Sequence, residues 1–400
     1  MGVYEELGLR PIINASGAVT RLGGAPMSQA VLDAFCEAAR QSVPLEQLQA
    51  VAAGAIAAAT GTESGLVTAG AAAALTLGAA AILARDDLAR MERLPHCDGF
   101  PDEFVIAREH RNGYDHAVRA AGARLVEVGF HEIVSGAGVR RAEAWEYEAA
   151  FGPRTAGVLY VLTAGSRPPL EEIVALAHAH HLPVLVDAAG ELSPRANLKA
   201  IAARGADLVA FSGGKAIRGP QATGILCGRR DLIGSAALQM LDMDDHEELW
   251  QPPVEFIDRT KFSGMPRHGI GRGFKVSKEQ IVALLAALRM FVRGDYDPEL
   301  AGHRQRLSLI ARQLAGCAAR CQLHDAGGEC LPLLEIAVDE QQLGRTALEV
   351  CRLLRAGSPP CHVGHAALRE GKLIVNPLHL DDASAGELTR RLREELTPPG

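Results

Sequence analysis

Short runs of apolar residues alternate with longer stretches of helical periodicity through most of the chain. The apolar runs have the length and β-branched content of buried strands and lie at 104–107, 125–128, 157–162, 183–187, 208–211 and 224–227. Between them, residues 114–123, 169–181 and 197–204 carry apolar side chains at helical spacing. This alternation predicts an α/β fold with a large, mostly parallel sheet covered on both faces. Such sheets bind ligands at the carboxyl ends of their strands.

A different pattern begins near residue 295. An apolar helix is predicted over 278–292, and Asp295-Tyr296-Asp297-Pro298 then breaks the chain. The remainder predicts a compact α+β unit with helix 303–315, strand 331–338, helix 346–355, a strand pair within 362–375 and helix 383–396. The sequence therefore predicts an N-terminal arm (1–15), a large domain (16–294) and a smaller C-terminal α+β domain (295–400).

Composition narrows the possible partners. The chain is 48% hydrophobic and 22% charged, with a net charge of −7, which is typical of a globular protein and excludes bulk attraction to nucleic acid or to an anionic membrane. The uncharged stretch between Glu63 and Arg85 is long enough to cross a bilayer, but it is rich in alanine and glycine. With the alanine-rich residues 47–62 it predicts a pair of buried helices, and we expect no membrane partner.

The spacing of the cysteines matches neither a disulfide pattern nor a metal-binding motif. The chain has 8 cysteines without a CxxC motif, and no signal peptide precedes the first apolar run. The pattern favours reduced thiols in the cytoplasm over disulfides or a metal site.

Two segments carry polar residues at the ends of predicted strands. The strand at 208–211 leads into Ser212-Gly213-Gly214-Lys215, where the glycines would let the backbone approach a bound group closely. A surface lysine in a glycine turn is the alternative. The strand at 183–187 ends in Asp187, whose carboxylate stays ionised beside a cation such as a protonated pyridine nitrogen. Alternatively, Asp187 could cap the N-terminus of a following helix.

Two further segments fit the same kind of ligand. In residues 66–75 a short strand turns at Gly70 into an alanine-rich helix whose free N–H groups could hold a phosphate, although an ordinary helix start has the same pattern. The strand at 104–107 precedes His110, which could stack on a planar ring or simply be solvated. Taken together and in this order, the segments resemble a pyridoxal-phosphate enzyme of the aspartate-aminotransferase fold (fold type I).

Three longer motifs make the resemblance more specific. Residues 186–192 (VDAAGEL), 211–221 (FSGGKAIRGPQ) and 271–279 (GRGFKVSKE) resemble the bacterial selenocysteine synthase family, and within it the D-glucosaminate-6-phosphate ammonia-lyase branch. The likeness extends from Pro11 to the C-terminal domain.

The resemblance implies a role for each matching residue. Lys215 would form the Schiff base, Asp187 would pair with the pyridine nitrogen and His110 would cover the ring. Cofactor contacts would also come from Gly70, Ala71, Ala72, Ala189 and Ser212. Arg272 and Lys275 would lie near the substrate or phosphate, unless they are only part of a solvated basic loop.

The chain departs from relatives in two places. Selenocysteine synthases carry an additional N-terminal tRNA-binding domain and a basic surface, so a tRNA substrate is not expected here. Relatives often present an arginine to the substrate carboxylate from the C-terminal strand pair, where this chain has His362, His365 and Asn376. His365 and Asn376 are therefore the candidate substrate contacts.

The expected reaction is α,β-elimination. A hydroxylated amino acid or amino sugar acid would give a 2-oxo acid and ammonia, with His110 or Lys215 as the acid for the leaving group. Racemisation or epimerisation, aldol cleavage, selenium transfer and non-catalytic cofactor binding are the alternatives. Enzymes of this fold complete their active sites across a subunit interface, so at least a homodimer is expected.

Overall fold

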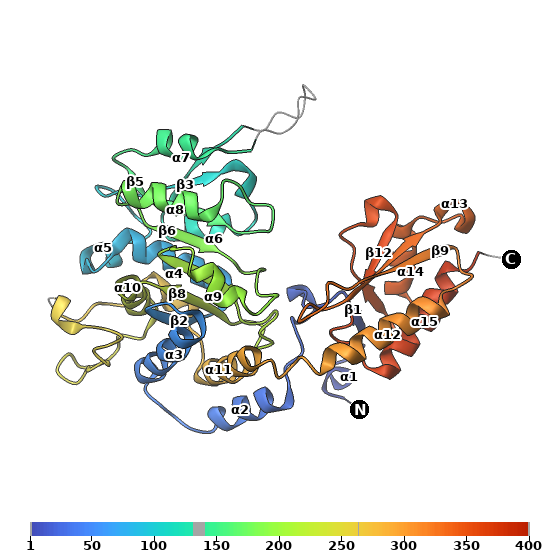
Figure 1. The fold of residues 1–400 in the computed structure, drawn as a ribbon. Helices are drawn as coiled ribbons and strands as arrows, with labels where there is room; N and C mark the ends of the chain where they lie inside the picture. Colours follow the sequence, from blue (N-terminus) through green and yellow to red (C-terminus); the bar gives the residue numbers. More distant parts are fainter. Residues whose placement is uncertain (1, 131–140, 263, 399–400) are drawn as a thin grey trace. The chain divides into compact units, whose positions relative to one another are not determined.

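Two compact units make up the protein. The computed structural model describes residues 2–130, 141–262 and 264–398. One unit comprises residues 27–292, and the other joins residues 1–26 to residues 293–400 (Figure 1). The first 26 residues therefore group with the C-terminal part of the chain, whereas the sequence-based division assigned residues 16–26 to the large domain.

The larger unit is built on one sheet. Its strands are β2 (Ser64–Thr68), β3 (Glu103–Ala107), β4 (Arg124–Val128), β5 (Thr155–Val161), β6 (Val184–Asp187), β7 (Leu208–Ser212) and β8 (Gly224–Gly228). Among the described residues they form a 7-stranded sheet in the order β2-β8-β7-β6-β5-β3-β4. Strands β3 to β7 pair in parallel, while β8 is antiparallel to both of its neighbours. The prediction of a mostly parallel α/β sheet is confirmed.

The helices of the larger unit are α2 (Gln29–Ala39), α3 (Leu45–Thr60), α4 (Gly70–Ala84), α5 (Leu88–Arg93), α6 (Asp115–Ala120), α7 (Ala144–Ala150), α8 (Leu170–Ala179), α9 (Asn197–Ala202), α10 (Arg230–Met240) and α11 (Lys278–Arg293). Helices α3, α4, α7, α8 and α10 pack directly on the sheet. Three 3-10 helices span Arg108–His110, Arg259–Lys261 and Ile270–Phe274.

Helix α4 explains why the uncharged stretch resembles a membrane span. Its residues from Ala73 to Ala84 are all buried, so it is apolar on every side because protein surrounds it. A Cβ on Gly78 would lie 2.9 Å from a methyl group of Leu185, so glycine lets the helix pack directly on β6. The two expected helices exist as α3 and α4 with β2 between them, but only α4 is buried over most of its length, because α3 exposes one face that includes Val51. Within the described part of the chain, no helix combines the length and hydropathy that a bilayer crossing needs.

The smaller unit is α+β. Its elements are α1 (Val3–Glu6), β1 (Ile13–Ala15), α12 (Glu299–Gln313), β9 (Ala319–His324), β10 (Leu333–Val338), α13 (Glu340–Leu343), α14 (Ala347–Ala356), β11 (Cys361–Val363), β12 (Lys372–Val375) and α15 (Asp382–Leu396), with 3-10 helices at Thr20–Leu22 and Leu368–Glu370. Strands β12, β10 and β9 form an antiparallel sheet, and β1 pairs in parallel with β11. This last pairing attaches the N-terminal segment to the C-terminal unit. Strand β9 was not predicted, because it is largely exposed and lacks an apolar run.

Candidate active site

Asp187 lies at the carboxyl end of β6 and is 7% exposed. Its Oδ1 accepts a hydrogen bond from the N–H of Ala189 at 3.0 Å. Burial raises the pKa of the Asp187 carboxyl, while that hydrogen bond and the positive charge of Lys215 act in the opposite direction. A buried carboxylate with this little compensation is stabilised as an anion by a further cationic group. Ala189, predicted to contact the cofactor, is thus placed where its N–H holds Asp187.

Lys215 lies on a compact loop that follows β7. The N–H of Gly213 donates to the carbonyl of Thr223 at 2.9 Å, the N–H of Gly219 donates to that of Gly213 at 2.9 Å, and the N–H of Arg218 donates to that of Lys215 at 3.0 Å. These bonds fix the backbone from which the lysine side chain extends. The lysine itself is half-buried.

The two glycines of this loop have a different explanation from the predicted one. A Cβ on Gly213 would lie 2.4 Å from Oγ1 of Thr223, and a Cβ on Gly214 would lie 2.5 Å from the Cα of Gln221. The absence of side chains therefore lets the loop pack against itself. Close approach of a ligand is not needed to account for them.

Glu191 is a further candidate site residue, which the sequence analysis did not single out. It lies on the turn after β6, where its N–H donates to the carbonyl of Ala188 at 3.1 Å. Burial and the charge of Asp187 raise the pKa of its carboxyl, and Lys215 lowers it. The one signal in the sequence was a second carboxylate four residues after Asp187, within the motif VDAAGEL.

The segment predicted to hold a phosphate lies at the start of α4. Gly70 adopts φ +89°, a left-handed conformation that favours glycine, between the end of β2 and the helix. A Cβ on Gly224 would lie 2.4 Å from the carbonyl carbon of Gly70 and 2.6 Å from the nitrogen of Ala71. Ser212 pairs with Gly224 across β7 and β8. Gly70, Ala71 and Ser212 are thus brought to one edge of the sheet, and Ala72 follows in the first turn of α4, exposed.

His110 ends the 3-10 helix after β3 and is 5% exposed. Neither of its ring nitrogens has a hydrogen-bond partner. Its ring packs edge-on against Tyr160, with centroids 4.7 Å apart. Burial lowers the pKa of His110 to about 4, so the imidazole is neutral at pH 7. Tyr160 precedes Val161, which pairs with Asp187, so His110 belongs to the same edge.

This set of residues fits pyridoxal phosphate. The carboxylate of Asp187 matches a pyridinium nitrogen, the neutral ring of His110 matches a stacking partner, and the start of α4 offers N–H groups to a phosphate. Lys215 would supply the amine for a covalent link.

Of the other predicted residues, Arg272 and Lys275 belong to the larger unit. Arg272 forms an ion pair with Asp242, which also lies 3.2 Å from Nε2 of His268. Arg272 and Lys275 line a cavity of about 400 Å³ beside α3 and α11. The basic loop lacks an acid of its own, but the fold brings Asp242 to it from the end of α10. The charge of Arg272 is therefore already compensated.

His365 and Asn376 belong to the smaller unit. Oδ1 of Asn376 accepts from the N–H of Leu378 at 3.0 Å, and its amide nitrogen would lie 2.5 Å from a Cβ on Gly17. A local structural role therefore explains Asn376. Nδ1 of His365 lies 3.5 Å from a guanidinium nitrogen of Arg355.

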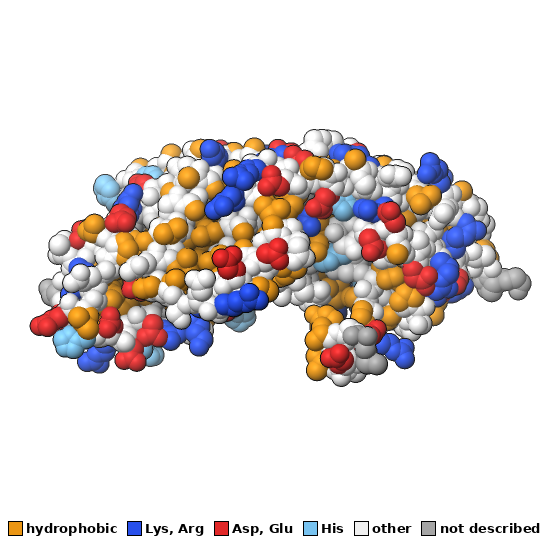
Figure 2. All heavy atoms as spheres, turned by 90° about the horizontal axis from the view of Figure 1, so that it is seen from below, with side chains coloured by type: hydrophobic (Ala, Val, Ile, Leu, Met, Phe, Trp, Pro, Cys, Tyr) orange, Lys and Arg blue, Asp and Glu red, His pale blue; other side chains and the backbone are white. Residues whose placement is uncertain are grey.

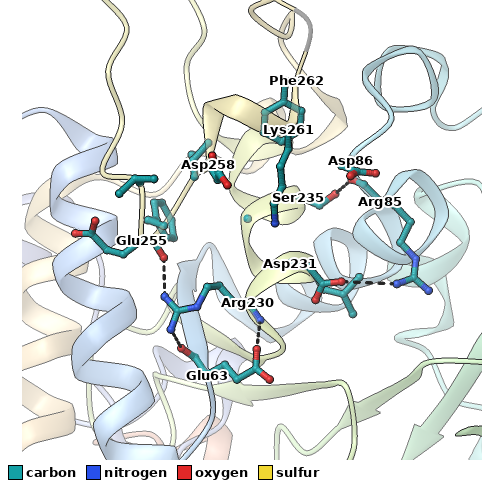
Figure 3. A pocket seen from close by; sticks show the side chains of 15 residues that line it. Glu63, Arg85, Asp86, Arg230, Asp231, Ser235, Glu255, Asp258, Lys261 and Phe262 are labelled. Carbon is teal, nitrogen blue, oxygen red and sulfur yellow. Dashed lines mark hydrogen bonds and ion pairs between the residues drawn. The ribbon is translucent and has the colours of Figure 1, made fainter.

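A separate cavity of about 550 Å³ opens at the opposite end of α4 (Figure 3). Arg85 and Asp231 line one side, and Glu63 and Arg230 the other. Arg230 donates to the carbonyls of Glu255 and Glu63 at 2.8 and 3.2 Å. None of the predicted site residues lines this cavity. Because α4 is 15 residues long, its start lies about 22 Å from the cavity.

Comparison with known proteins agrees with this geometry. The aminotransferase class-V family matches residues 140–244. The 5'-C-glycyluridine monooxygenase-decarboxylase of Streptomyces sp. is 32% identical over 99% of this chain and 92% of its own length. D-glucosaminate-6-phosphate ammonia lyase of Salmonella typhimurium is 28% identical over 98% and 97%. A solved structure of D-glucosaminate-6-phosphate ammonia-lyase superposes with a TM-score of 0.81 at 27% identity, covering 99% and 98%.

L-seryl-tRNA(Sec) selenium transferase of Rhizobium meliloti is 28% identical over 87% of this chain and 71% of its own length. The chain belongs to the selenocysteine synthase family of pyridoxal-phosphate-dependent enzymes. Its fold is that of the aspartate aminotransferases, and its cofactor is pyridoxal phosphate, as predicted. Membership of this family turns Lys215, Asp187 and His110 from separate candidates into one proposed cofactor site.

Proposed function

We propose that this enzyme catalyses α,β-elimination from a hydroxylated amino acid or amino sugar acid, giving a 2-oxo acid and ammonia. The full-length likeness to an ammonia lyase, in sequence and in fold, favours this reaction over racemisation or aldol cleavage. The observation that carries the proposal is the carboxyl edge of the sheet. There the charge of Lys215 acts on the buried carboxylate of Asp187, and the neutral ring of His110 follows a neighbouring strand of the same sheet.

In this proposal Lys215 moves the protons. Bound pyridoxal phosphate supplies an electron sink next to the substrate amino group. The free amine of Lys215 removes the proton from Cα, the bond from Cβ to the hydroxyl breaks, and the resulting ammonium returns a proton so that water departs. Hydrolysis of the released enamine, through its imine, consumes one water and yields the 2-oxo acid and ammonia. Atoms therefore balance without a further reactant.

The charge states of Asp187 and His110 define their roles in this mechanism. Asp187 stays ionised opposite the pyridine nitrogen. The pKa of His110, lowered to about 4 by burial, disfavours this residue as the leaving-group acid near neutral pH. Of the two acids considered from the sequence, Lys215 is the one that remains.

A second candidate is oxidative. The 32% identical relative is named as a monooxygenase-decarboxylase of 5'-C-glycyluridine, a nucleoside that carries an amino acid. An enzyme of that type would consume dioxygen and release carbon dioxide. The two candidates therefore differ in their co-substrate and in their products.

The experiment compares both reactions in one set of samples. Purified holoenzyme is incubated with hydroxylated amino acids, phosphorylated amino sugar acids and 5'-C-glycyluridine, in air and without oxygen. We expect ammonia and a 2-oxo acid at equal rates in both atmospheres, and none with Lys215→Ala. Product that forms only in air together with carbon dioxide would support the second candidate. An inverted but otherwise unchanged substrate, or an aldehyde, would overturn the elimination.

We further infer that the enzyme acts on a small molecule as a homodimer or larger homo-oligomer. Figure 2 shows hydrophobic side chains gathered on the face seen from below. Several large hydrophobic residues of the larger unit are exposed. They include Leu32 of α2, Val43 just before α3, Val51 within α3 and Val292 of α11. Sedimentation equilibrium of the holoenzyme tests this, and a monomer at micromolar concentration would contradict it.

A further inference from the structure

The cavity at the end of α4 combines charged and apolar walls within the larger unit. Its volume of about 550 Å³ is in the range of roughly 300–1,000 Å³ that holds small organic ligands. Its apolar wall consists of Leu232, Val254, Phe256, Ile257 and Phe262. Phe256 and Ile257 are buried, and Phe262 is half-buried. An apolar group placed in the cavity would therefore contact aromatic and aliphatic surface.

Three cationic side chains line the same cavity, namely Arg85, Arg230 and Lys261 (Figure 3). Arg85 directly follows α4, Arg230 is the first residue of α10, and Lys261 ends a 3-10 helix. Residues 230–232, the first turn of α10, all line the cavity, and the N-terminus of a helix favours negative charge. Three segments that are distant in the sequence therefore each bring positive charge to one place.

The acidic residues of the cavity are largely engaged with other groups. They are Glu63, Asp86, Asp231, Glu255 and Asp258. Glu63 accepts the backbone N–H at the start of α10 at 3.0 Å. Both oxygens of Asp231 accept from the guanidinium of Arg229, at 3.1 and 2.6 Å. Asp258 accepts from the hydroxyl of Thr260 at 2.6 Å. The remaining two are exposed to solvent.

The three cations are less well compensated than these acids. The guanidinium of Arg230 donates to two backbone carbonyls, which carry no net charge. Arg85 forms a long ion pair, at 4.0 Å, with Asp231, which already binds Arg229 at 2.6 Å. Burial, followed by the charge of Arg229, lowers the pKa of Arg85. The ammonium group of Lys261 forms no hydrogen bond or ion pair with any described residue.

The backbone of Arg85 is in an unusual conformation. Its φ of 54° and ψ of −126° lie in a region that residues with a side chain rarely adopt. The hydroxyl of the buried Ser235 donates to the carbonyl of Arg85, and the N–H of Arg85 donates to the carbonyl of Ala81 at 2.9 Å. These bonds hold the conformation, which places a guanidinium in the wall of the cavity. Such conformations are concentrated at functional sites.

A structural role explains only one of the three cations. The bonds from Arg230 to the carbonyls of Glu255 and Glu63 join the loop after α10 to the start of β2, so they stabilise the fold. No such bond accounts for Lys261. The strained backbone of Arg85 costs free energy instead of adding to stability.

We propose that this cavity is a second binding site, for a small organic anion that carries a phosphate or carboxylate group on an apolar body. The acid group would pair with Lys261 in the positive field of Arg85 and Arg230, and the body would contact Phe256 and Phe262. The cavity lies about 22 Å from the start of α4, so its occupant is separate from the reacting substrate. This site does not depend on the proposed function.

The first test measures binding to holoenzyme, saturated with pyridoxal phosphate, by calorimetry. The probes are phenyl phosphate and phenylacetate, with benzyl alcohol as the neutral analogue and inorganic phosphate as the acid group without a body. We expect at least one of the two organic anions to bind. Benzyl alcohol and inorganic phosphate should each bind at least about tenfold more weakly than that anion.

The second test locates the bound anion. Lys261→Gln should weaken its binding about tenfold, because the charged partner of the acid group is lost. Lys261 is exposed, so the variant should fold, and thermal unfolding checks this. Lys199→Gln removes an exposed lysine of α9 that does not line the cavity and should leave binding unchanged.

The third test examines the sign of the charge. Glu255→Gln removes an exposed negative charge from the cavity and should strengthen binding of the anion about twofold. Benzylamine, which carries a positive charge on the same body, should bind more weakly than the anion. The reverse order of affinity, together with weaker benzylamine binding by Glu255→Gln, would show a site for cations and overturn the proposal.

Two other results would overturn it. One is that neither organic anion binds to wild-type holoenzyme. The other is that Lys261→Gln binds the anion as tightly as wild type does, which would locate the anion elsewhere. Turnover in the elimination reaction is measured on the same samples without the anion and should be the same for Lys261→Gln and wild type. Absence of elimination with anion binding intact would reject the proposed function alone.

Discussion

Two buried aspartates lie at opposite edges of the same sheet and have opposite surroundings. Asp207, at the amino end of β7, is 4% exposed and has a complete set of partners. Its oxygens accept from the N–H of Val184 at 2.8 Å and from Arg229 at 2.9 Å, and lie 2.9 Å from Nε2 of His178. Asp187, at the carboxyl end of β6, has one backbone N–H and a lysine that forms no ion pair with it within the described residues.

The difference separates a carboxylate that supports the fold from one that is prepared for a ligand. Both aspartates follow or precede apolar strands, and both are almost completely buried. A satisfied network is explained by stability, whereas an unsatisfied buried charge indicates a missing partner.

The largest expected effect is a loss of turnover on mutation of Lys215, at the carboxyl edge of the sheet. Lys215→Ala should lower turnover by roughly 10³-fold or more, because the amine that moves the protons is lost. Lys199→Ala removes an exposed lysine from α9 and should leave turnover unchanged. Steady-state kinetics with both variants decide this, and comparable activity of Lys215→Ala would remove the lysine from the mechanism.

At the amino edge, the expected effect is on stability. Asp207→Ala leaves the N–H of Val184 without its acceptor and removes the anion between Arg229 and His178. We expect the free energy of unfolding to fall by about 3 kcal/mol, with cofactor binding retained in the folded fraction. Urea denaturation of the cofactor-free protein measures the change. A loss below about 1 kcal/mol would show that this network does not stabilise the fold.

His110 should make the protein sensitive to acid. Its pKa in the fold, about 4, is below the ordinary value of 6.5, so the neutral form is favoured and the stability it contributes is present above pH 6.5. That stability is lost as pH falls from 6.5 through about 4, by roughly 3 kcal/mol at most. Compared with wild type, His110→Phe should lose less stability over this range, whereas the exposed His96→Gln should follow the wild type. Identical pH profiles for His110→Phe and wild type would contradict the assignment.

The smallest expected effect is that of Asp187→Asn on stability, and it tests the contrast between Asp187 and Asp207 directly. The pKa of Asp187 is raised, so its ionisation disfavours the cofactor-free fold, and stability is lost as pH rises through the raised value. Asp187→Asn should therefore leave the cofactor-free protein as stable at pH 7, or about 1 kcal/mol more stable, while weakening pyridoxal phosphate binding. Parallel unfolding and cofactor titrations test both parts. A large loss of stability without cofactor would make Asp187 resemble Asp207.

Much of the fold could be predicted because the signals are local. The apolar runs at 183–187 and 208–211 match β6 and β7 within a residue, and the prolonged helix 278–292 matches α11. The exposed strand β9 lacked such a pattern. The grouping of residues 16–26 could not be predicted either, because it depends on the pairing of β1 with β11, which are about 350 residues apart.

For the candidate site, too, one part could be predicted from local sequence and another part depended on the tertiary structure. The sequence by itself determined which segments carry the lysine, the carboxylate, the histidine and the helix start, because each is a short motif beside a strand. Only the tertiary structure decided which polar groups have partners: it gave Arg272 the carboxylate of Asp242, left both ring nitrogens of His110 without hydrogen-bond partners, and brought Glu191 and Lys215 to Asp187. Burial and distant partners set the charge and the pKa of a side chain, and neither is written in the residues next to it.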